Sequence, residues 1–264
     1  MTRASYVAVL SVGFSALLLA GLAQSQASKP APQPPAPGVE ATAIAALNKM
    51  GAYLRTLKAF QVKGVSSTDD VTDDGQLLES DAVSDVLAQA PNKLRVEVTR
   101  DDQHRIYYYN GKSITVYGAH VNYYATVAAP PTISQLADEL YDKYGIDLPL
   151  QDLFTWGTSR SEASKITAGF DAGPSQIQGV TCEQYAFRQE GLDWQIWIQS
   201  GDYPLPRKIV LTTTSDPARP RHSVVLTWNL APSFNDAAFD FDPPKDAHKI
   251  AIAEVRPSAA EKQK

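Results

Sequence analysis

The sequence predicts a mainly β domain of the α+β class, in which a twisted antiparallel sheet closes only partly around helical elements. Three observations predict it. Segments that alternate apolar and polar residues run through 60–127 and return over 165–230. Turn-forming residues separate these segments, as they do in hairpins. Segments with helical spacing of apolar residues, 40–57 and 132–144, flank the first run. The predicted order is therefore helix, sheet, short helices, sheet.

Residues 1–27 are typical of a secretory signal peptide. An apolar run from Tyr6 to Ala23 follows Arg3, and Ala23 and Ala27 each offer a small residue for cleavage. A retained membrane anchor is the alternative, because the run is long enough to approach the ~20 residues that span a bilayer. No cysteine follows the run. We therefore expect a periplasmic protein that is not a lipoprotein.

Three further segments follow the signal peptide. Residues 28–39 are rich in proline and predict an extended linker, with a PxxP ligand as the less favoured interpretation. Residues 40–255 form the predicted folded domain, and residues 256–264 form a polar tail. The length of the folded part suits one large β domain with a continuous core.

Charge and cysteine content restrict the function. The formal net charge is −5, so the chain lacks the basic surface that nucleic-acid binding needs. Cys182 is the one cysteine, which excludes an internal disulfide. The apolar core must therefore supply the stability.

Three helices are expected. In the first, 40–57, one face carries Ala43, Leu47, Met50, Leu54 and Leu57. In the second, 132–144, Thr132 is a plausible N-cap and the apolar face carries Ile133, Leu136, Leu140 and Tyr144. A short third helix is expected over 150–154, after Pro149.

The strands are expected where alternation is clearest, and a hairpin over 192–211 is the most informative of them. Trp194, Ile196 and Ile198 alternate with polar or outward positions before Gly201, and Ile209 and Leu211 resume the pattern. Asn110-Gly111 predicts a second hairpin with a tight type I′ turn. A last edge strand is expected at Phe239–Asp242, before Pro243-Pro244. The other expected strand segments are 60–62, 77–90, 94–98, 106–109, 114–116, 123–127, 165–170, 175–188 and 223–230.

Four of these segments together resemble a known family. They are WQIWI from Trp194, the turn at Gly201-Asp202, PLPRKI from Pro204, and FDFDPP from Phe239. The combination is similar to predicted periplasmic proteins of unknown function grouped with the LolA/LolB lipoprotein carriers. The resemblance implies a half-open β-barrel wrapped around an N-terminal helix and short lid helices, with an apolar interior for acyl chains or a related ligand. The buried lid arginine of LolA-type carriers cannot be assigned here, because no local motif marks it.

No catalytic, metal or cofactor site is expected. Residues 70–81 partly mimic a calcium loop, but strand-like residues flank them and a hairpin turn is the better interpretation. Cys182 lies in a strand pattern without a marked histidine partner. No GxSxG, Walker or Rossmann motif occurs. The histidines, which show no metal-ligand spacing, are His104, His120, His222 and His248.

Candidate ligand-lining residues follow from the inward phase of the strands and the apolar helix faces. Whether inward means a filled core or a cavity is left open. For the tyrosines at 107–109, 117, 123 and 124, ordinary cross-strand packing is favoured over a ligand-lining role. The candidates are Leu94, Val96, Val98, Tyr108, Val116, Tyr123, Leu136, Leu140, Phe154, Trp194, Ile196, Ile198, Leu211, Leu226 and Trp228.

The function expected from these observations is a periplasmic binding or carrier protein for a lipid or an acylated lipoprotein, held in the concave face of the sheet. The alternative is a non-catalytic envelope sensor or scaffold of the same fold that binds a partner protein, since fold alone does not fix function. The sequence leaves the ligand and the oligomeric state open.

Overall fold

The computed structural model describes residues 38–156 and 162–254. The predicted signal peptide, nearly all of the linker and the polar tail lie outside the described residues. At the start of the described chain, Val39 forms an isolated β-bridge with Gly169.

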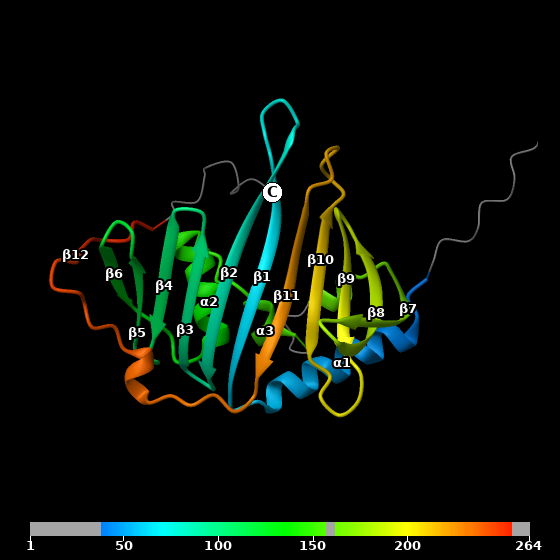
Figure 1. Cartoon of the computed structure of the whole chain (residues 1–264), viewed down its shortest axis with the longest axis horizontal. Helices are drawn as coiled ribbons and strands as arrows, with labels where there is room; N and C mark the ends of the chain where they lie inside the picture. Colours follow the sequence, from blue (N-terminus) through cyan, green and yellow to red (C-terminus); the bar gives the residue numbers. More distant parts are fainter. Residues whose placement is uncertain (1–37, 157–161, 255–264) are drawn as a thin grey trace, which may run out of the picture. The chain divides into compact units, whose positions relative to one another are not determined.

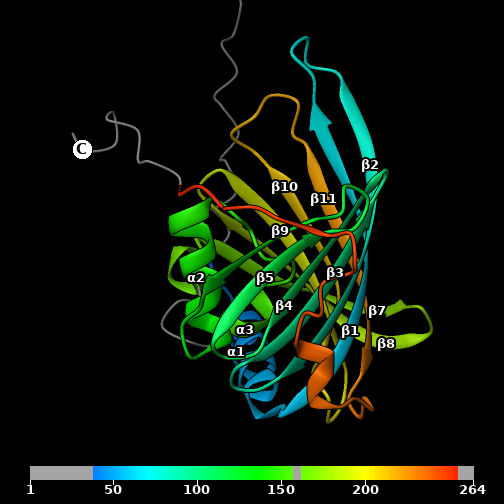
Figure 2. The ribbon, with the colours of Figure 1, turned by 90° about the vertical axis from the view of Figure 1, so that its left-hand side faces the viewer.

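The described residues form one twelve-stranded sheet, in the order β12-β6-β5-β4-β3-β2-β1-β11-β10-β9-β8-β7 (Figure 1). Every neighbouring pair is antiparallel except β12 with β6. The two end strands, β12 and β7, do not pair, so the sheet curls without closing (Figure 2). The predicted half-open barrel is confirmed. The strands are β1 (Ala59–Val71), β2 (Leu77–Gln89), β3 (Lys93–Arg100), β4 (Gln103–Tyr109), β5 (Ser113–Gly118), β6 (Tyr123–Ala128), β7 (Ala168–Ile177), β8 (Val180–Gln189), β9 (Leu192–Gln199), β10 (Pro206–Thr213), β11 (Arg221–Asn229) and β12 (His248–Lys249).

The two longer helices lie against the concave side of the sheet and follow the predicted spacing. In α1 (Ala41–Thr56) the buried residues are Ala43, Leu47, Met50, Gly51 and Leu54. In α2 (Ile133–Tyr144) Thr132 caps the N-terminus by accepting a hydrogen bond from the backbone N of Gln135 at 3.3 Å. Gly145 ends α2 with φ of +63°, the left-handed conformation that favours glycine. The shorter helices are α3 (Asp152–Thr155), η1 (Glu162–Lys165) and η2 (Asp236–Phe239).

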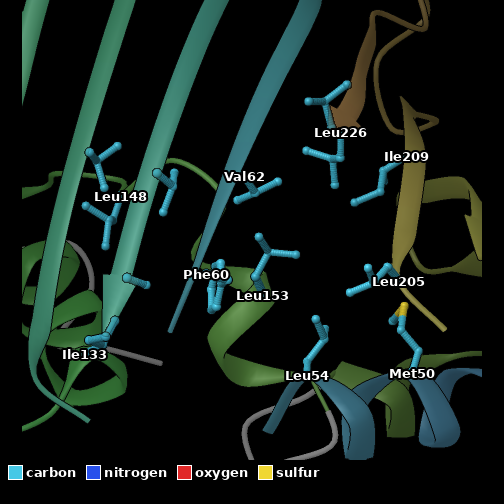
Figure 3. Packing of buried hydrophobic residues seen from close by; sticks show 14 of the residues in the cluster. Met50, Leu54, Phe60, Val62, Ile133, Leu148, Leu153, Leu205, Ile209 and Leu226 are labelled. Carbon is cyan, nitrogen blue, oxygen red and sulfur yellow. The ribbon is translucent and has the colours of Figure 1, made fainter. Parts of the chain in front are cut away.

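The core lies between the concave face and these helices. Figure 3 shows Met50 and Leu54 of α1 and Leu153 of α3 pointing toward Val62 and Ile209 of the sheet. Alternate residues of each strand reach this core, because successive side chains in a strand point to opposite faces. Each large apolar side chain that is fully buried contributes about 1.5–3 kcal/mol.

Two hairpins differ from prediction in their turns. The β4–β5 hairpin is present, but only Gly111 has a positive φ, of +87°, so the turn is not type I′. Asn110 instead accepts hydrogen bonds with its Oδ1 from the backbone N of Lys112 and of Ser113, both at 3.1 Å. The predicted strand 175–188 is in fact divided by a tight turn at Gln178-Gly179, where both residues have positive φ.

The last predicted strand is wrong. Phe239 ends η2, and residues 240–247 continue without strand pairing. Pro243 and Pro244 explain this, because proline has no N–H to donate to a sheet. The edge of the sheet is instead completed by β12, whose two residues pair in parallel with Tyr123 and Tyr124 of β6.

The opposite edge, β7, is irregular. The pairing of β7 with β8 shifts register between Asp171 and Gly173, which forms a β-bulge, and Pro174 follows within the strand. Gly169 lies beneath a neighbouring ring, since a Cβ there would approach Cδ1 of Phe187 to 2.6 Å. A glycine is therefore required where β7 passes Phe187.

Candidate functional site

A cavity of about 280 Å³ lies between the concave face of β8–β11 and the helices α1, α3 and η1. Its lining is mainly apolar, with a few polar groups. The apolar residues are Leu47, Leu150, Leu153, Trp156, Ala163, Ile166, Leu192, Trp194, Ile209, Leu211 and Val224, and the polar residues are Asn48, Asp152, Thr155, Gln189 and His222. This composition, an apolar pocket with few polar groups, is typical of a small-molecule site.

The sheet wall of the cavity comes from the hairpin that the sequence marked most clearly. Ile196 of β9 pairs with Ile209 of β10, and Trp194 pairs with Leu211. All four therefore share the concave face. Trp197 and Val210 occupy the opposite face, where they pack with Cys182 in a separate small cluster.

Aromatic rings form part of this wall. The rings of Phe187 and Trp194 stack with centroids 4.4 Å apart and an interplanar angle of 26°. Phe187 is buried, whereas Trp194 is half-buried and lines the cavity. The stacked pair therefore presents a rigid apolar surface to whatever occupies the space.

The cavity has a polar end at the start of β11. His222 lines it, and the Nδ1 atom of His222 lies 2.7 Å from Oγ1 of Thr68 on β1. Burial lowers the pKa of His222 below its ordinary value of 6.5. The imidazole is therefore neutral at neutral pH, with one ring nitrogen able to donate and the other able to accept a hydrogen bond.

The predicted lining residues fall into three groups. Trp194 and Leu211 line the cavity. Eleven others lie in or against the filled core: seven are buried, namely Leu94, Val96, Leu136, Leu140, Ile196, Ile198 and Leu226, and four are partly buried, namely Val98, Val116, Phe154 and Trp228. The remaining two, Tyr108 and Tyr123, lie elsewhere. The half of the half-barrel formed by α2 and strands β3–β5 is filled with buried side chains.

Tyr108 lies on the convex face and does not face the interior. Its ring packs against Phe241 with centroids 5.4 Å apart, and the guanidinium of Arg95 lies 5.7 Å from it. The inward positions belong to Tyr107 and Tyr109, which pair with Val96 and Leu94. A run of three tyrosines shows no alternation, so the sequence does not indicate which of them points inward. The pairing of β4 with β3 determines this.

Tyr123 shares the parity of the concave face but is not enclosed. Its side chain is 44% exposed, and its ring lies 5.5 Å from that of His248 on β12. Its position at the edge of the sheet explains the exposure.

Several lining residues escaped the sequence analysis. The spacing in α1 predicts only that Leu47 lies on the apolar face of a helix. The alternation in β10 predicts that Ile209 points inward but does not assign it to a site. His222 was considered only as a catalytic or metal-binding residue. Nothing in the local sequence indicates that Gln189 and His222 line the same cavity, because β9 and β10 separate their strands.

Among residues 38–156 and 162–254, no group of three His, Cys, Asp or Glu side chains is placed to hold a metal ion. No described helix is both long and apolar enough to cross a membrane. Burial raises the pKa of the Cys182 thiol. Residues 70–81 form the turn and flanking strands of the β1–β2 hairpin, with Asp70 bound to Arg100.

Comparison with known proteins gives one family and several distant folds. The model of a family described as "Predicted periplasmic protein (DUF2092)" matches residues 43–253. No curated protein matches the sequence.

Three solved structures with similar folds are distant from this chain in sequence. An uncharacterized conserved protein from Thermus thermophilus is 12% identical, with 80% of this chain and 99% of that chain covered and a TM-score of 0.46. LprF from Mycobacterium bovis is 12% identical, with 80% of this chain and 99% of that chain covered and a TM-score of 0.42. A LolA superfamily protein from Nitrosomonas europaea is 12% identical, with 75% of this chain and 97% of that chain covered and a TM-score of 0.35.

Proposed function

The chain belongs to the DUF2092 family of predicted periplasmic proteins, and on this premise we propose that it is an exported carrier that binds a hydrophobic ligand. The ligand is a lipid or the acyl chain of a lipidated protein, and it occupies the cavity between β8–β11 and the helices α1 and α3. The apolar lining of this cavity is the observation that carries the proposal. Export by a signal peptide over residues 1–27, without lipidation, belongs to the same proposal.

The volume of the cavity allows the free energy of ligand burial to be estimated. At ~30 Å³ for a group the size of a water molecule, about 280 Å³ accommodates about nine such groups. Each buried methylene contributes about 0.8 kcal/mol, so nine contribute roughly 7 kcal/mol before the cost of ordering the ligand. That gross value suits a carrier, which must both hold and release its ligand.

The division of the half-barrel supports a carrier as well. The side formed by β3–β5 and α2 is filled by buried residues, whereas the side formed by β8–β11 with α1 and α3 contains the cavity. Stability can therefore reside in the filled half while the other half exchanges its ligand. The lining of apolar side chains favours binding without chemical conversion.

A specific surface favours the alternative of a sensor or scaffold. The β1–β2 hairpin projects beyond the other strands (Figure 1). On its convex face Val65 is 57% exposed and Val83, its cross-strand partner, is 52% exposed. Exposed apolar side chains of this kind suit a protein partner.

Ligand binding is tested on the purified protein by native mass spectrometry, lipid extraction and titration with Nile red. We expect copurifying lipid and one saturable dye site. If neither is found, the carrier proposal is wrong and the hairpin surface becomes the better candidate.

The site itself is tested with two matched variants on β11. Val224→Phe places a ring into the cavity, whereas Val225→Phe places the same ring on the opposite face. We expect Val224→Phe to weaken dye binding by at least about tenfold, or ~1.4 kcal/mol, and Val225→Phe to leave it unchanged. Equal effects of the two variants would remove the cavity as the binding site.

A further inference from the structure

We infer that the cavity holds a single acyl chain, not two or three, and that the polar end of the ligand lies at His222. This inference rests on the proposed function, which concerns any hydrophobic ligand. It adds a limit on the number of chains and a direction for the chain within the protein.

The limit on chain number follows from the space available. The cavity accommodates about nine methylene-sized groups, at ~30 Å³ each. That is one medium-length chain, and a second chain would need about as much again. The other half of the concave face offers no such space, because Leu94, Val96, Leu136 and Leu140 there are 0–1% exposed and packed together.

The direction of the chain follows from the strand ends. Gln189 ends β8, Leu211 lies near the end of β10, and His222 lies near the start of β11. Because β8–β11 are antiparallel neighbours, these residues share one end of the cavity. At the other end lies α1, where Lys49 donates a hydrogen bond from Nζ to the carbonyl of Gly201 in the β9–β10 turn. A chain lying along the strands therefore runs from His222 toward α1.

The chemistry at His222 selects the polar end. Nδ1 is occupied by Thr68, while Nε2 has no hydrogen-bond partner within the described part of the chain. Because the neutral ring offers a single donor or acceptor there, it fits a hydroxyl or an ester carbonyl. A glycerol monoester provides both groups.

Chain number is tested by offering the full chain phosphatidylcholine vesicles that contain equal amounts of monolauroylglycerol and dilauroylglycerol, then separating the protein and extracting its lipid. We expect one monolauroylglycerol per protein and at least about tenfold less diacyl lipid. Equal or greater recovery of dilauroylglycerol or phosphatidylcholine overturns the single-chain inference and leaves the carrier proposal intact. Recovery of no lipid, with no Nile red site, overturns the carrier proposal itself.

The position of the polar end is tested with His222→Leu and its conservative counterpart His222→Gln. Loss of one hydrogen bond is expected to lower monolauroylglycerol recovery about 3- to 10-fold in His222→Leu, with recovery largely restored in His222→Gln. Thr68→Val, which removes only the hydroxyl that orients the ring, is measured beside them and should weaken recovery in the same direction. Unchanged recovery in His222→Leu, or in Thr68→Val if His222→Leu does not fold, overturns the assignment.

Discussion

The ring of Phe241 lies against the ring of Tyr108 on the convex face, with centroids 5.4 Å apart. Phe241 also contacts Tyr117 and Tyr124, at 5.3 and 5.0 Å. The neighbouring Asp240 accepts a hydrogen bond from Nδ2 of Asn110 at 2.8 Å. The segment after η2 is thereby fixed to the outside of β4–β6, on the side of the sheet away from the cavity.

Phe241→Ala should therefore reduce stability without affecting the cavity. Phe241 is half-buried, so we expect the free energy of unfolding to fall by about 1–3 kcal/mol, less than for a fully buried ring. Denaturant unfolding measures this, and Phe170→Ala, at an exposed ring on β7, serves as the control with a smaller effect. A change in Nile red affinity would contradict the separation of this aromatic group from the cavity.

Leu140→Ala tests the filled half of the half-barrel. Leu140 is fully buried in α2 and does not line the cavity, so truncation should cost about 2–5 kcal/mol of unfolding free energy. Dye affinity should stay unchanged at temperatures where the variant is folded. Leu211→Ala is the matched variant in the hollow half, and it should alter dye affinity at a smaller cost in stability.

Tyr109 should give the protein a loss of stability at alkaline pH. Its hydroxyl donates a hydrogen bond to the carbonyl of Pro130 at 2.5 Å, and burial raises the pKa of Tyr109 to about 12 from its ordinary 10.0. The unfolded chain therefore loses this proton first, and the stabilisation present below pH 10 declines as the pH rises toward 12. Tyr109→Phe should cost about 1 kcal/mol at neutral pH and flatten this decline in urea titrations. An unchanged slope would exclude Tyr109 as its source.

His222 should give the protein a loss of stability at acid pH, whereas Tyr109 does so at alkaline pH. Its pKa is lowered by burial, so the folded protein binds this proton less readily than the unfolded chain does. The resulting stability is complete above the ordinary value of 6.5 and is lost as the pH falls through the lowered pKa. Unfolding midpoints measured from about pH 7.5 downward should fall less steeply in His222→Gln than in the native protein. Equal slopes would show that the ring does not titrate as its burial implies.

Local patterns were enough to predict most elements but not the site. The spacing in α1 and α2 and the alternation in β9 and β10 each reflect a single interface with the core, so sequence alone predicts them. Which of the residues Tyr107–Tyr109 point inward depends on pairing with β3. The place of Phe241 depends on its contacts with tyrosines more than 100 residues earlier in the chain. The cavity arises because α1 and α3 do not fill the space before β8–β11, which is a property of packing between distant segments and leaves no local signal.

The open sheet leaves two strand edges, and both are unsuited to recruiting another strand. On β7 the bulge at Asp171 and the following Pro174 interrupt a regular row of hydrogen-bonding groups. On the other side the two residues of β12 shield the edge of β6 with a strand too short to extend the sheet. The sheet can therefore stay open between β7 and β12 without offering a regular edge as a template for fibril growth.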